Sequence, residues 1–125
     1  IYWPSGYNTA FQITTKDSNT WVHYDPTSWA AVCYMTPDAP RNTGTAIFRH
    51  KKTGKYKYEE GDTDWNDRKN KHVWEDWEQL DYCANIYNRL VIYHGAFYHS
   101  SVIAGFGDGI KDGRLFQTFF FDTED

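Results

Sequence analysis

The chain has 125 residues, 40% of them hydrophobic and 19% aromatic, and carries a formal net charge of −4 at pH 7. This length fits a single domain over 1–125, and the acidic balance excludes the basic surface with which proteins bind nucleic acid or anionic membranes. No apolar run approaches the roughly 20 residues that cross a bilayer. The two cysteines, Cys33 and Cys83, are too few for a disulfide framework. We therefore expect two buried free thiols and a cytoplasmic location.

Short strands follow one another in the first half of the chain. Apolar and polar residues alternate over 7–15, which predicts a strand, and Lys-Asp-Ser-Asn at 16–19 predicts the turn after it. Further strands are predicted at 20–25, 29–36 and 44–50, and aromatic residues suit packed sheets. This rhythm predicts a mainly β domain with the architecture of a jelly roll, or double-stranded β-helix, as in cupins.

The second half begins with a charged, turn-rich segment. Residues 51–71 predict a long mobile loop, which is either a lid over a site or a solvated excursion. After this insertion, Val73, Trp77 and Leu80 stand at helical spacing, so we expect one short helix over 72–82. A strand is predicted at 88–93, and Arg114 begins the last strand of the chain.

The positions of two histidines and one aspartate in the sequence predict a metal site. His23 and Asp25 are two residues apart, so in a strand their side chains point to the same face. His99 supplies a third ligand, with His94 as its competitor, whereas His50 and His72 are expected at the surface or at an element end. Two histidines and a carboxylate with open coordination positions form the ligand set of non-haem Fe(II) oxygenases.

Arg114 adds a cation to this set. It heads a row of inward-facing residues that continues with Phe116, Thr118 and Phe120 on the same side of the strand. An arginine at the head of an apolar row needs an anionic partner. Its planar guanidinium suits a carboxylate, because it meets both oxygens.

The order of strands, His-x-Asp, distal histidine and arginine resembles the 2-oxoglutarate- and Fe(II)-dependent oxygenases, especially the prolyl-4-hydroxylase-like group, from about Gly6 to Asp122. The resemblance implies that His23, Asp25 and His99 are the catalytic metal ligands. It also implies that Arg114 binds the distal carboxylate of 2-oxoglutarate and that Tyr34 donates a hydrogen bond to the same group. A helical layer that is common at the N-terminus of that family would be short or missing here.

One position departs from the family pattern. Some members carry a serine or threonine two residues after the arginine, where this chain has Phe116. A hydroxyl contact to the cosubstrate would then have to come from elsewhere, for example from Thr118. The assignment of Fe(II) is therefore better supported by the motif than the assignment of 2-oxoglutarate.

The resemblance implies an oxidoreductase that hydroxylates a peptide, prolyl-like, or small-molecule substrate and releases succinate and CO2. Asp25 favours hydroxylation, since halogenating relatives lack the carboxylate ligand. Two alternatives stay open. One is a non-catalytic carbohydrate-binding β-sandwich, indicated by the aromatic content, and the other is a cupin-like metalloprotein that does not use 2-oxoglutarate. The sequence leaves the substrate and the oligomeric state open.

Overall fold

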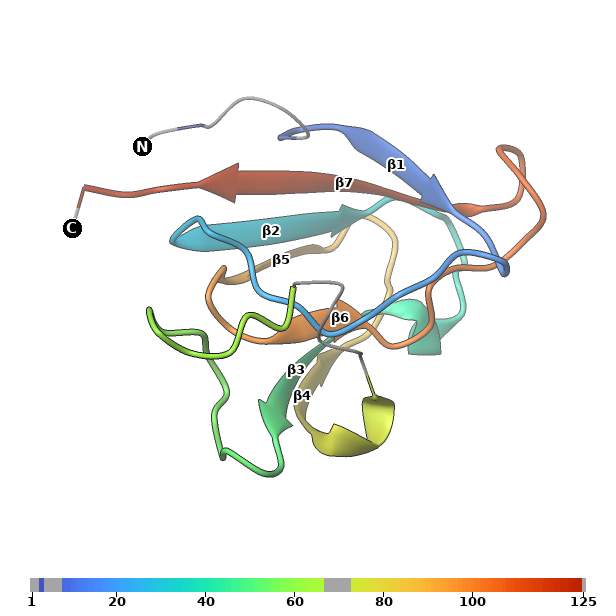
Figure 1. Ribbon diagram of the computed structural model, residues 1–125. Helices are drawn as coiled ribbons and strands as arrows, with labels where there is room; N and C mark the ends of the chain where they lie inside the picture. The colour runs from blue at the N-terminus through green and yellow to red at the C-terminus, as the bar shows by residue number, and fades with distance from the viewer. Residues whose placement is uncertain (1–2, 4–7, 67–72, 125) are drawn as a thin grey trace.

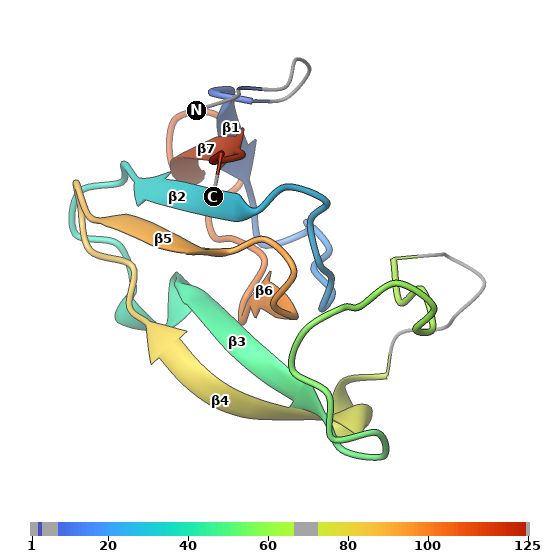
Figure 2. The same ribbon diagram turned by 90° about the vertical axis from the view of Figure 1, so that its left-hand side faces the viewer.

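The computed structural model describes residues 3, 8–66 and 73–124 and is mainly β, with two antiparallel sheets that face each other (Figures 1 and 2). The four-stranded sheet has the order β1 (Phe11–Thr14), β7 (Arg114–Phe121), β2 (Trp29–Tyr34), β5 (Leu90–His94). The three-stranded sheet has the order β4 (Trp77–Cys83), β3 (Thr45–His50), β6 (His99–Ser101). Two single 3-10 turns, η1 (Arg41–Thr43) and η2 (Trp74–Asp76), complete the regular structure of the described residues.

Most of the predicted strands are confirmed. The predictions at 29–36, 44–50 and 88–93 correspond to β2, β3 and β5, and Arg114 does begin the last strand, β7. The predicted strand at 7–15 is shorter in the structure, where β1 covers Phe11–Thr14 and Tyr7 lies outside the described residues. In the segment 20–25, only His23 pairs, through a bridge to His99.

The predicted helix over 72–82 is wrong. His72 lies outside the described residues, Trp74–Asp76 form one 3-10 turn, and the chain then continues as strand β4. The reason is a register shift where β4 pairs with β3, between Ile47 and Phe48. Such a bulge inserts one extra residue and breaks the period of two that otherwise reveals a strand in the sequence.

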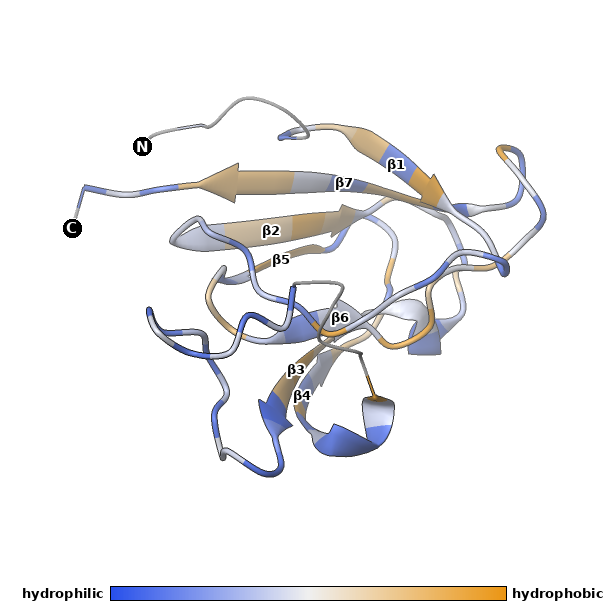
Figure 3. Ribbon diagram, viewed as in Figure 1, coloured by the Kyte–Doolittle hydropathy of each residue, from blue (hydrophilic) through white to orange (hydrophobic). Residues whose placement is uncertain are grey.

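The space between the two sheets holds a small core. Val32, Tyr34 and Phe116 are buried there, and Val91 and Tyr93 pack against them. Val32 and Tyr34 stand two apart on β2, so they point to the same side of the sheet. Figure 3 colours β2, and the part of β7 near its C-terminal end, as largely hydrophobic. The two strands meet in register, with Tyr34 opposite Phe116.

A second apolar cluster, the outer cluster, lies on the other side of the three-stranded sheet. Its buried members are Val22, Ala46, Phe48, Trp77 and Tyr98, and partly buried aromatic residues from 51–66 pack on it. Figure 2 shows this green segment beyond the end of β3. The described part of the predicted loop thus covers one face of the sheet, while 67–71 lie outside the described residues.

The outward face of the four-stranded sheet is apolar as well. Phe11 and Ile13 of β1, and Leu90 and Ile92 of β5, are all exposed there. Cys33, on the same sheet, and Cys83 are free thiols as expected, but they are only partly buried and not buried as predicted. Within the described ranges, no helix has the length and apolar character needed to cross a membrane.

Candidate metal centre

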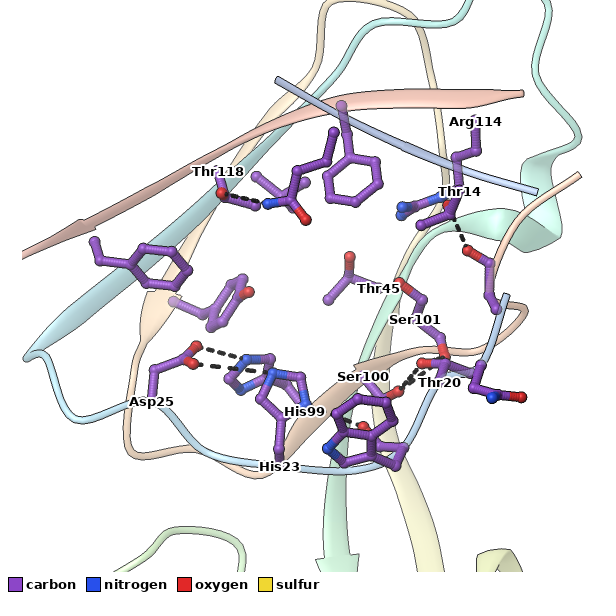
Figure 4. Close-up of a pocket in the computed structure, with 18 residues that line it drawn as sticks. Thr14, Thr20, His23, Asp25, Thr45, His99, Ser100, Ser101, Arg114 and Thr118 are labelled. Atoms are coloured by element: carbon purple, nitrogen blue, oxygen red, sulfur yellow. Dashed lines mark hydrogen bonds and ion pairs between the residues drawn. The ribbon is translucent and has the colours of Figure 1, made fainter. Parts of the chain in front are cut away.

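Three side chains predicted as metal ligands converge between the sheets (Figure 4). His99 is the first residue of β6, and His23 pairs with it through two backbone hydrogen bonds of 3.0 and 2.9 Å. Asp25 follows two residues after His23, and its N–H donates to the carbonyl of Gly95 at 2.7 Å. One potential ligand atom from each of the three residues lies within 4.8 Å of the other two.

The period of two that was expected for this segment is present. Val22 is fully buried and Tyr24 packs with it on the outer cluster, whereas His23 and Asp25 line the cavity on the other side. The alternation therefore places Val22 and Tyr24 on the side away from the ligands, while Trp21 lines the cavity with them. The structure brings His99 into this group, but His94 lies exposed at the end of β5, stacked on Trp29 with ring centroids 4.3 Å apart.

Both histidines are oriented by backbone carbonyls. The Nδ1 of His23 lies 3.0 Å from the carbonyl oxygen of Trp21, and the Nδ1 of His99 lies 2.6 Å from that of Phe97. A carbonyl oxygen only accepts, so each ring carries its proton on Nδ1 and leaves Nε2 unprotonated when neutral. The carbonyls therefore set the tautomer and the ring orientation that metal-binding histidines usually have.

The two Nε2 atoms face Asp25. They lie 3.9 Å (His23) and 2.9 Å (His99) from its carboxylate oxygens. Two unprotonated nitrogens and a carboxylate present lone pairs to one another, and this arrangement needs a cation between them, either a metal ion or an added proton. His99 is almost completely buried, so its ring is held firmly in place. The donor set thus fits a divalent metal bound through two nitrogens and one oxygen.

Arg114 lies at the other end of the same cavity (Figure 4). It is 1% exposed, its Nε donates to the carbonyl of Thr43 at 2.9 Å, and its guanidinium lies over the ring of Phe116 at 4.4 Å. Burial lowers the pKa of Arg114 from its ordinary value. Among the described residues, no carboxylate pairs with it. A buried cation that faces a cavity without an acidic partner has the charge and geometry to bind an anion.

Tyr34 lies behind this pocket and is not one of the residues that line it. It is fully buried, the guanidinium of Arg114 lies 5.7 Å from its ring centroid, and its hydroxyl donates to Thr45 Oγ1 at 2.7 Å. Thr45 does line the cavity. Because its oxygen already accepts from Tyr34, the hydroxyl proton of Thr45 is available for a group inside.

The cavity has a volume of about 260 Å³. Thr118, named from the sequence as another source of a hydroxyl, lines it and accepts a hydrogen bond from Gln12 Nε2 at 2.9 Å. Burial, and then the nearby charge of Asp25, raise the pKa of Tyr93, whose ring lies 4.6 Å from that of His99. The lining residues that the sequence analysis did not single out include Gln12, Thr14, Trp21, Thr45, Tyr93 and Ser101.

His50 lies at a strand end, as predicted, but it is buried and not at the surface. His50, predicted at the surface or at a strand end, is 4% exposed at the end of β3 and stacks on Trp65 with ring centroids 4.7 Å apart. Its stacking partner, Trp65, belongs to the segment 51–66, and nothing in the sequence beside His50 indicates this contact. The ring of His50 also contacts Trp77 of the outer cluster, and His50 lies outside the group of potential ligands.

Comparisons with known proteins give one family. No curated protein and no solved structure matches the chain significantly. The model of a family of unknown function, DUF6445, matches residues 12–121, a range that includes both sheets almost completely and all five predicted site residues. The chain therefore belongs to this family of unknown function, DUF6445.

Proposed function

We propose that the protein is a 2-oxoglutarate- and Fe(II)-dependent dioxygenase that hydroxylates its substrate, and that its two sheets form a double-stranded β-helix. One observation carries the proposal. A triad of two histidines and one aspartate shares a cavity with a buried arginine that has no carboxylate partner among the described residues. The first feature fits Fe(II), and the second fits an anion that binds beside it.

The triad would hold the iron. His23, Asp25 and His99 would supply three ligand atoms, which would leave positions on the iron for the cosubstrate and for oxygen. Bound Fe(II) supplies the oxygen chemistry of the overall reaction, in which 2-oxoglutarate, O2 and a C–H bond give succinate, CO2 and an alcohol. The chain itself orients the reactants and limits water, with Val32 and Phe116 in the cavity wall.

Arg114 would bind the distal carboxylate of 2-oxoglutarate. Its Nε is taken by Thr43, which leaves the two terminal nitrogens for a bidentate contact. Thr45 would donate its hydroxyl proton to the same carboxylate, because Tyr34 already donates to the oxygen of Thr45. Thr45 would therefore supply the hydroxyl that Phe116 cannot, and Tyr34 would act through Thr45.

The substrate is expected to be a peptide, prolyl-like, or a small molecule whose reacting carbon enters beside Asp25. The rim offers Trp21, half exposed, and the polar side chains of Gln12 and Asn19. A cupin-like metalloprotein that binds iron without 2-oxoglutarate is the second candidate, because Phe116 stands where some relatives of the resembled family carry a hydroxyl.

The proposal is tested by titrating metal-free protein anaerobically with Fe(II) and then with 2-oxoglutarate. We expect the weak visible charge-transfer band of the iron-bound oxo acid in the parent protein. His99→Ala should abolish it, whereas His94→Ala, which changes an exposed histidine outside the triad, should leave it intact. Iron binding without the band would favour the second candidate. No retained metal would overturn both and leave a binding module as the better account.

A further inference from the structure

The ligand-bearing segment 23–25 is held by three different parts of the chain. His23 pairs with His99 through its backbone, and Asp25 donates its N–H to Gly95. Tyr24, between them, is held by a side chain. Asn66 Oδ1 accepts the N–H of Tyr24 at 3.1 Å, and Asn66 Nδ2 donates to the carbonyl of Tyr24 at 2.7 Å.

This contact imitates a β-bridge. A primary amide offers one acceptor and donors on one planar group, so Asn66 satisfies both backbone groups of a single residue as a paired strand would. The side chain of Tyr24 is held as well. Its ring stacks on Tyr58 with centroids 4.0 Å apart and planes at 1°, and its hydroxyl donates to Asp64 Oδ1 at 3.2 Å.

The same segment also holds the chain that leads to the third ligand. The N–H of Tyr58 donates to the carbonyl of Ala96 at 2.8 Å, and the N–H of Tyr98 donates to the carbonyl of Tyr56 at 3.0 Å. Phe97, between these two residues, orients His99 through its carbonyl oxygen. Residues 56–58 are therefore paired with 96–98, directly before His99.

Trp65, next to Asn66, anchors the segment to the sheet by stacking on the buried His50. Within the segment, Lys55 forms an ion pair with Asp62 at 2.8 Å. Burial of aromatic side chains against the outer cluster gives the segment a fixed position relative to the three-stranded sheet. The segment that contacts Tyr24 and residues 96–98 is therefore itself packed against the outer cluster.

We propose that segment 55–66 is a clamp that sets the geometry of the metal centre from outside the cavity, with Asn66 as its main positioning residue. The inference rests on the proposed metal site and names residues that do not touch the metal. Ligands must stay within about 0.5 Å of their productive positions. Loss of groups that orient ligands typically weakens metal binding by about 10–100-fold. Without Asn66, the backbone at Tyr24 loses two hydrogen bonds. The orientation of the flanking ligands, His23 and Asp25, is then less well fixed.

The test is a titration of metal-free protein with Co(II), followed through its visible absorption bands, which report the number and arrangement of ligands. Asn66→Ala should bind Co(II) about 10–100-fold more weakly and give altered bands. Asn42→Ala is the matched control, since Asn42 is exposed in η1, which precedes the start of β3, whereas segment 55–66 follows the end of β3. Tyr24→Phe removes the hydroxyl that donates to Asp64 but keeps the ring and both backbone hydrogen bonds to Asn66, so it should fold and show a smaller change in the same direction.

The outcomes separate the two proposals. If the parent protein binds no Co(II), the proposed function fails and the clamp fails with it. If the parent binds Co(II) and both clamp variants match it in affinity and in absorption bands, the clamp is overturned while the proposed function stands. A lower melting temperature of the metal-free variants, with unchanged bands and affinity, would likewise mean that the segment only stabilises the fold.

Discussion

Replacing Arg114 with methionine should separate stability from cosubstrate binding. The substitution removes a guanidinium that is 1% exposed and keeps an unbranched apolar side chain in its place. It removes one hydrogen bond to Thr43, worth about 1.5–3 kcal/mol because the donor is charged. It also removes the contact with the ring of Phe116, worth about 0.5–2 kcal/mol.

The opposing effect is of similar size. A buried cation without an acidic partner carries a desolvation penalty of several kcal/mol, and methionine does not. We therefore expect the unfolding free energy of ligand-free Arg114→Met to stay within about 2 kcal/mol of the parent value. Affinity for 2-oxoglutarate should fall much further. Truncating one partner of a buried charge pair costs about 2–5 kcal/mol, which corresponds to a loss of about 30-fold to several thousand-fold.

Urea unfolding of the metal-free protein gives the first quantity, and anaerobic titration of the Fe(II)-loaded protein with 2-oxoglutarate gives the second. Arg49→Met is the control, because Arg49 is an exposed partner of Glu78 and should affect neither by more than about 1 kcal/mol. Parent-like affinity for the oxo acid in Arg114→Met would refute the reasoning, most clearly if the variant were also strongly destabilised, since Arg114 would then have only a structural role.

Two further predictions concern stability and the backbone near the ligands. Burial lowers the pKa of His50 below its ordinary value, so the unfolded chain binds a proton more readily, and stability should be lost as pH falls below about 6.5. Urea unfolding at pH 7.5 and 5.5 should show a smaller loss for His50→Gln than for the parent, while His94→Gln should behave as the parent does; equal losses in all three would exclude His50 as a cause. A Cβ on Gly95 would lie 2.1 Å from the carbonyl oxygen of Thr27, so Gly95→Ala should cost about 1–3 kcal/mol and weaken Co(II) binding through displacement of Asp25, whereas Gly109→Ala, with open space around it, should do neither.

The ligand segment could be predicted from the sequence because its pattern is local. Val22 and Tyr24 alternate with His23 and Asp25, and the period of two assigns the two pairs to opposite faces without any knowledge of their partners. The structure places the apolar pair on the outer cluster and the polar pair in the cavity. The row headed by Arg114 follows the same logic along β7.

Strand β4 could not be predicted in this way. Trp77 and Tyr82 both pack on the outer cluster although they are five residues apart, an odd spacing that a regular strand cannot place on one face. The register shift opposite Ile47 and Phe48 supplies the extra residue. Val73 and Leu80, which suggested a helix together with Trp77, are both exposed.

The surroundings of the site depend on contacts that no local pattern contains. Asn66 and Tyr58 stand in a charged, turn-rich stretch, and nothing near them in the sequence indicates that Tyr24 is their partner. The same holds for His50. Its two lysine neighbours suggest a surface residue, but in the structure Trp65 stacks on it. Alternation predicts strand β1, but only its pairing with β7 decides that Gln12 faces the cavity.

The backbone bridge between His23 and His99 would also couple metal binding to folding. In an unfolded chain only His23 and Asp25 are neighbours, and the third ligand arrives when two segments far apart in the sequence have closed a long loop. A metal that requires all three ligands therefore binds the native chain and hardly at all the unfolded one, and it stabilises the fold by mass action. In kinetic terms, the ion would bind after the two segments have paired, and it would have to dissociate before they separate.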